Sequence, residues 1–204
     1  MATERFDHED VEILGEETHY DGFWRLKVIE LRHRRFAGGW SEVLRREIHC
    51  RGEAVGVLLY DPELDAVGLV EQFRVGALGR TGSPWLFELV AGLVEAGETP
   101  EQVAVRETRE EAGCELRALA PVAEYFSSPG GSDEYFHIFC GCAKLRDAEA
   151  LHGVEGEHED IRLHVIPWER ALQRLGEGLF NNAHTLLAMQ WLREHRDEVR
   201  RAWR

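Results

Sequence analysis

The chain has 204 residues, 44% hydrophobic and 30% charged, which is typical of a globular protein with one large domain or one domain and an appendage. The net charge of −14 argues against a nucleic-acid-binding protein, which would present a basic surface. No apolar run approaches the ~20 residues of a transmembrane helix, and residues 1–10 lack the apolar segment of a signal peptide. The four cysteines form no C-x-x-C pair, so we interpret them as reduced residues of a cytoplasmic protein.

Apolar runs separated by turn residues predict a series of strands. They span residues 23–34, 42–50, 55–60, 66–73, 85–90, 121–127, 134–142 and 161–166. Gly38-Gly39 marks the turn between the first two, and Asp61-Pro62 marks a hairpin between the third and fourth. Two helices follow the strands, a short one over 167–175 that Gly176 ends and an amphipathic one over 183–195.

A further helix of about 13 residues is predicted between Thr99 and Gly113. Thr99 and Gln102 form a capping box, Pro100 suits the first helical position, and Gly113 suits a left-handed residue at the end. Strands with three helices between and after them predict an α/β sandwich.

The predicted helix carries three glutamates at i, i+3 and i+4. This spacing places Glu107, Glu110 and Glu111 on one face. We expect the opposite face, with Val105, Thr108 and Ala112, to pack inward. Because like charges on adjacent turns repel, a hard divalent cation such as Mg2+ would relieve the repulsion.

The glutamates belong to a longer pattern that runs from Gly92 to Cys114. It reads G-x5-E-x7-R-E-U-x-E-E-x-G-U, where U is an apolar residue, and Thr108 and Cys114 are its two weakest matches. The chain therefore resembles the Nudix hydrolases, which cleave a nucleoside diphosphate linked to another group. Within the pattern we expect Arg106 to hold the loop, by pairing with Glu98, and not to touch substrate.

Three features outside this pattern resemble the ADP-ribose pyrophosphatases of that family. Pro129 follows Gly113 by sixteen residues, residues 156–161 resemble the acidic loop of those enzymes, and the segments at 46–47, 71–74 and 84–85 are also similar. The resemblance implies a Nudix-fold α/β/α sandwich with a mixed sheet over residues 51–204. It also implies a small β-sheet section over residues 1–50 that two subunits of a homodimer exchange.

The resemblance also implies roles for single residues. Expected metal ligands, for Mg2+ or for Mn2+ in its place, are the Ala91 carbonyl, Glu107, Glu111 and Glu159. Glu157 matches the proton acceptor, and Glu110 matches a supporting position. Expected ADP-ribose contacts are Phe23, Trp24, Arg46, Glu47, Arg51, Arg74, Leu93 and Ser128. Arg46 and Glu47 would reach the site of the other subunit.

The expected reaction is hydrolysis of the pyrophosphate of ADP-ribose to AMP and ribose 5-phosphate, with water deprotonated by Glu157 or another carboxylate of the same loop. Hydrolysis of another nucleoside diphosphate sugar, such as GDP-mannose, is the alternative within the family. An NADH pyrophosphatase is less favoured, because a four-cysteine zinc module is missing. A non-catalytic ADP-ribose sensor is the alternative from another class, and it is disfavoured because Glu107, Glu110 and Glu111 are all present.

Overall fold

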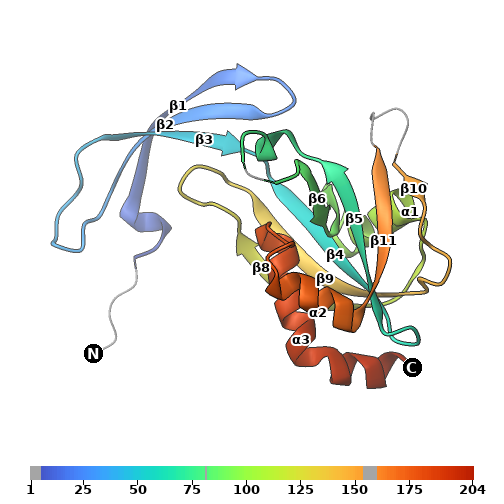
Figure 1. The fold of residues 1–204 in the computed structure, drawn as a ribbon. Coiled ribbons are helices and arrows are strands. Elements are labelled where there is room, and N and C mark those ends of the chain that lie inside the picture. The colour runs from blue at the N-terminus through green and yellow to red at the C-terminus, as the bar shows by residue number, and fades with distance from the viewer. Residues whose placement is uncertain (1–5, 81, 154–159) are drawn as a thin grey trace. The chain divides into compact units, whose positions relative to one another are not determined.

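The computed structural model describes residues 6–80, 82–153 and 160–204, which divide into two compact units. Unit 1 comprises the N-terminal residues through Gly52 together with Phe126–Glu134, and unit 2 comprises Glu53–Tyr125 and Tyr135–Arg204. Figure 1 shows both as ribbons. No helix in the described parts of the chain is long and apolar enough to cross a membrane.

Unit 1 is built on a three-stranded antiparallel sheet in the order β1-β2-β3. Its elements are the 3-10 helix η1 (His8–Asp10) and the strands β1 (Val11–Asp21), β2 (Arg25–His33) and β3 (Leu44–Cys50). The predicted glycine turn between β2 and β3 is confirmed, since Gly38 and Gly39 have φ of +87° and +75°. Strand β1 is not among the predicted strands, because its side chains are mostly exposed and follow no clean alternation.

Unit 2 contains an eight-stranded mixed sheet. Its strands are β4 (Glu53–Asp61), β5 (Ala66–Phe73), β6 (Trp85–Glu88), β7 (Val90–Leu93), β8 (Leu116–Phe126), β9 (Tyr135–Ala143), β10 (Leu151–His152) and β11 (Ile161–Pro167). The main order is β10-β11-β5-β4-β9-β8, while β6 pairs with β5 and β7 with β4. The β4–β9 pair is parallel, and β4–β5 is the predicted antiparallel hairpin.

Helices cover both faces of this sheet, as Figure 1 shows. On one face α1 (Pro100–Ala112) buries Val103 and Ala104 against β4, β5 and β7. On the other face α2 (Trp168–Gly176) and α3 (Ala183–Trp203) bury Trp168 and Met189. The prediction of an α/β/α sandwich is confirmed, and its central strand β4 is buried from Ala54 to Asp61 because helices lie on both sides of it.

Helix α3 runs eight residues beyond the predicted end at His195. Its last turns are fixed by the β4–β5 hairpin: Arg196 Nε lies 2.8 Å from Asp65 Oδ1, and Arg200 Nε lies 3.0 Å from the carbonyl oxygen of Pro62. The sequence did not predict these last turns, because they are polar and are stabilised by contacts with the β4–β5 hairpin.

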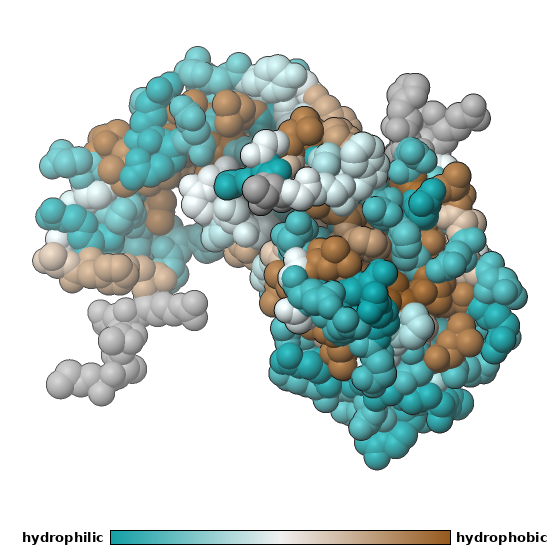
Figure 2. Space-filling model, in the orientation of Figure 1, coloured by the Kyte–Doolittle hydropathy of each residue, from teal (hydrophilic) through white to brown (hydrophobic). Residues whose placement is uncertain are grey.

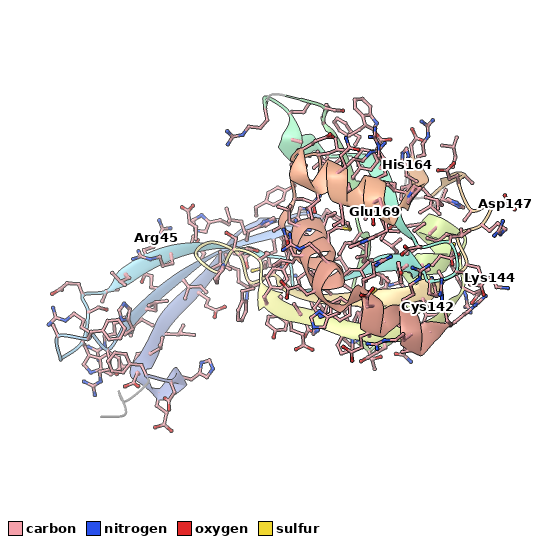
Figure 3. All side chains as sticks on the ribbon, turned by 60° about the horizontal axis from the view of Figure 1, so that its bottom comes forward. Arg45, Cys142, Lys144, Asp147, His164 and Glu169 are labelled. Carbon is pink, nitrogen blue, oxygen red and sulfur yellow. The ribbon has the colours of Figure 1, made fainter. Side chains whose placement is uncertain are left out.

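The four cysteines carry free thiols, and three of them are buried. Cys140 and Cys142 lie two residues apart on β9, and Cys142 is labelled in Figure 3. Burial raises the pKa of the Cys142 thiol above its ordinary value. Both cysteines therefore behave as small core residues.

Candidate active site

Helix α1 begins and ends as the sequence predicts. The Thr99 backbone N–H donates to Gln102 Oε1 at 2.8 Å, and the Gln102 N–H donates to Thr99 Oγ1 at 3.3 Å. Gly113 closes the helix with φ of +60°. Both caps are local, so residues within about one turn of each end set where the helix begins and ends.

Arg106 clamps the loop that precedes α1. Its Nε donates to Glu98 Oε1 and its Nη2 to Glu98 Oε2, each at 3.0 Å, and Nη2 also donates to the Leu93 carbonyl at 3.3 Å. These hydrogen bonds hold the pKa of Glu98 below its ordinary value. The expected Arg106–Glu98 pair is confirmed, and Leu93 takes part through its backbone.

Glu107 reaches the segment where β7 passes α1. A Cβ at Gly92 would lie 1.7 Å from Glu107 Oε1, so only a glycine leaves room for this carboxylate in its observed position. Arg106 Nη1 donates to the same oxygen at 2.6 Å. The first glycine of the motif is thus explained by close approach and not by a turn.

Glu111 is the buried member of the cluster, with a relative exposure of 3%. Its Oε2 accepts a hydrogen bond from the Ala91 N–H at 2.9 Å, which ties the carboxylate to β7. Glu111 therefore lies inward with Thr108 and Ala112, whereas Val105 is only half-buried. The prediction that Val105 packs inward opposite Glu111 was wrong, because the helix turns this carboxylate toward the sheet.

Glu110 lies on the outer side of the helix. Its carboxylate accepts from Arg106 Nη1 at 3.2 Å. A groove of about 640 Å³ follows this outer side and is lined by Glu101, Gln102, Val105, Arg106, Arg109 and Glu110. Neither Glu107 nor Glu111 lines it, so the candidate active site is on the β7 side of α1.

A second charged pair joins Arg74, which follows β5, to Glu88, the last residue of β6. Arg74 Nε donates to Glu88 Oε2 at 2.8 Å, and the Glu88 side chain is 16% exposed. Nearby Gln72 is 7% exposed, and its Nε2 has no hydrogen-bond partner within the described part of the chain. Glu88 is not among the predicted site residues, although a lone glutamate inside an apolar strand is a usable signal.

In unit 1 an aromatic and charged group forms around Trp24. The Arg51 guanidinium carbon lies 4.2 Å from the centroid of the Trp24 ring, and Arg51 Nε lies 2.7 Å from Glu134 Oε1. The Phe23 ring packs edge-on against Trp24 at 4.6 Å and is 85% exposed. Phe23 and Trp24 thus offer flat apolar surface of the kind that stacks on a base.

The remaining expected contacts of unit 1 lie on β3 and on the 126–134 segment. Arg46 and Glu47 are exposed on β3, and Arg46 Nη1 donates to the Arg45 carbonyl at 3.0 Å. Arg45 is labelled in Figure 3. The Ser128 carbonyl accepts from the Gly131 and Ser132 N–H groups at 3.1 and 3.0 Å, so it shapes the turn.

Glu157 and Glu159 lie outside the described residues. Among the residues that the structure does describe, no three His, Cys, Asp or Glu side chains are grouped to hold a metal ion. Glu107 and Glu111 nevertheless supply hard oxygen donors next to Ala91, where a Cβ at position 92 would fill the space. This donor set fits Mg2+, which prefers carboxylate and carbonyl oxygens.

Known proteins are similar to this chain over most of its length. The family described as the NUDIX domain matches residues 51–186. The ADP-ribose pyrophosphatase of Haemophilus influenzae is 43% identical over 204 residues, which cover 98% of this chain and 94% of that protein. A more distant relative, the GDP-mannose pyrophosphatase of Cronobacter sakazakii, is 35% identical over 90% of this chain and 95% of its own length.

The fold also matches a solved structure. The crystal structure of an ADP compounds hydrolase superposes with a TM-score of 0.71 and covers 96% of this chain and 100% of its own. Its sequence is 21% identical, so this likeness supports the fold and not the substrate.

Proposed function

Because the chain belongs to the Nudix family, we propose that it hydrolyses the pyrophosphate linkage of ADP-ribose. One observation carries the proposal: the similarity to a protein named ADP-ribose pyrophosphatase extends over 98% of this chain. Water adds to one phosphorus atom, the bond to the bridging oxygen breaks, and AMP and ribose 5-phosphate form.

The Ala91 carbonyl, Glu107 and Glu111 would hold Mg2+, together with Glu159. When bound, Mg2+ offsets charge on the pyrophosphate oxygens and acidifies a bound water. The hydrogen bond from the Ala91 N–H fixes one Glu111 oxygen, so this carboxylate is oriented before substrate arrives. Glu157 is the proposed base that takes the proton from the attacking water.

The other expected contacts would recognise the two ends of the substrate. Arg74 and Arg51 supply cations for the phosphates, and Phe23 and Trp24 supply the surface for adenine. Four further residues remain proposed substrate contacts: Leu93 in unit 2, and Arg46, Glu47 and Ser128 in unit 1.

We also propose a homodimer that exchanges residues 1–50, since Phe23 and Phe36 of that section are 85% and 99% exposed. Brown apolar side chains are visible among the teal ones over β1–β3 in Figure 2.

A phosphate-release screen tests the substrate. The purified protein is incubated with ADP-ribose, GDP-mannose, NADH or diadenosine polyphosphates in millimolar Mg2+, with alkaline phosphatase to release phosphate from the monoester products. We expect the highest kcat/KM for ADP-ribose and no release when a chelator replaces Mg2+. A higher value for GDP-mannose would favour the second activity, for which the 35% identical GDP-mannose pyrophosphatase is the supporting observation. Tight ADP-ribose binding without release would support the sensor.

A further inference from the structure

Glu88 is a half-buried carboxylate that the proposed reaction does not use. It pairs with Val70 across β5 and β6, and Val70 packs in the cluster that includes Val103 and Ala104 of α1. Directly opposed residues of paired strands share a face, so Glu88 lies on the α1 face of the sheet, the same face as the candidate active site. A carboxylate with a side-chain exposure of 16% needs a polar partner.

That partner is Arg74, and only one edge of its guanidinium is used. Nε donates to Glu88 at 2.8 Å, while Nη1 and Nη2 have no hydrogen-bond partner among the described residues. The Arg74 side chain is 46% exposed, compared with 16% for Glu88. The half-buried Glu88 carboxylate thus holds the inner edge of the guanidinium, and the outer edge keeps the paired donors that bind phosphate oxygens.

We propose that Glu88 is a positioning residue, which aims the Nη donors of Arg74 at the anionic oxygens of a nucleoside diphosphate. The inference rests on the proposed function. Holding Nε removes rotamer freedom from the arginine before the substrate binds, so less freedom is lost on binding. A simple structural ion pair that ties β6 to the residue after β5 is the competing explanation.

Two nearly isosteric substitutions separate these explanations. Glu88→Met removes both oxygens, whereas Glu88→Gln keeps a carbonyl oxygen that accepts the Arg74 Nε–H. At saturating Mg2+ we expect Glu88→Met to raise the KM for ADP-ribose about tenfold with kcat within about threefold, because uniform binding is lost. We expect Glu88→Gln to stay within about threefold of wild type. If Glu88 acted only by repelling the negative charge of the substrate, Glu88→Gln would lower the KM, and that result would overturn the proposal.

The matched control is Glu115→Met. Arg109 Nε lies 2.8 Å from Glu115, as in the Arg74–Glu88 pair, but both side chains are exposed. We expect wild-type kinetics from this variant.

The double substitution provides the decisive comparison. In an Arg74→Ala background Glu88→Met should change KM less than about twofold, because no guanidinium remains to be positioned. An undiminished effect there, or a shift in the Mg2+ concentration for half-maximal activity, would show that Glu88 acts elsewhere and would overturn the proposal. If Glu88→Met does not fold, Arg74→Lys is measured in its place. Lysine lacks the fixed pair of guanidinium donors, so the KM should rise by a similar factor. Adding Glu88→Gln to Arg74→Lys should then change the KM no further.

Failure of the two proposals can be told apart. Wild-type protein that cleaves neither ADP-ribose nor GDP-mannose would refute the proposed function and this inference with it. Active wild-type protein with unchanged KM in Glu88→Met would refute the inference alone.

Discussion

Gly92→Ala tests the candidate active site with a single methyl group. The new Cβ would lie 1.7 Å from Glu107 Oε1, and ordinary van der Waals contact begins at 3.4 Å, so the carboxylate must move by about 3.4 − 1.7 = 1.7 Å. The nearest atoms all belong to the Glu107 side chain, so this side chain and not the backbone will yield. A misplacement of about 1 Å can cost on the order of 100-fold in rate. We therefore expect kcat/KM to fall at least about 100-fold, or about 2.7 kcal/mol of transition-state stabilisation.

Stability should change little by comparison. The main loss is the hydrogen bond between Arg106 Nη1 and Glu107, which contributes about 1 kcal/mol or less at a partly exposed site. ADP-ribose hydrolysis and thermal unfolding should be measured side by side, with Gly176→Ala as control because a Cβ there meets no atom within 4 Å.

The loss of activity in Gly92→Ala should depend on the Glu107 side chain. In a Glu107→Ala background the clash is gone, so Gly92→Ala should add little further loss. Near wild-type kcat/KM in Gly92→Ala, or a full additional loss in the double variant, would refute the assignment of Glu107.

Three further predictions follow from other contacts. Glu111→Gln should lower kcat about 100-fold or more because one carboxylate supports several kcal/mol of charge stabilisation, and near wild-type turnover in a folded variant would contradict the metal assignment. Asp65→Asn, which keeps a residue tolerant of φ of +56°, should lower the free energy of unfolding in urea by about 2 kcal/mol at pH 7. The hydrogen bond from Arg196 lowers the pKa of Asp65, so the wild type should lose this advantage as pH falls below about 4, and a pH-independent difference would refute it. Light scattering should show a dimer, and mixing Arg46→Ala chains with Glu111→Gln chains should restore part of the activity; a monomer at micromolar concentration would exclude the strand exchange.

The sequence by itself determined the elements whose signals are local. Helix α1 could be placed to the residue because the Thr99 capping box, Pro100 and the left-handed Gly113 act within one turn of the chain. Strand β5 and the β4–β5 hairpin follow from apolar runs around a proline turn. The Arg106–Glu98 pair was also predictable, because both residues belong to one motif.

Tertiary structure decided the contacts between elements distant in the sequence. Helical spacing places Glu107, Glu110 and Glu111 on one side, but only the approach of β7 makes Glu111 buried and leaves Glu110 exposed. The same approach explains Gly92, and strand pairing between β5 and β6 brings Glu88 to Arg74. Likewise, the β4–β5 hairpin holds the polar last turns of α3. Sequence periodicity defines which residues share a face, whereas the identity of the facing surface depends on packing between elements.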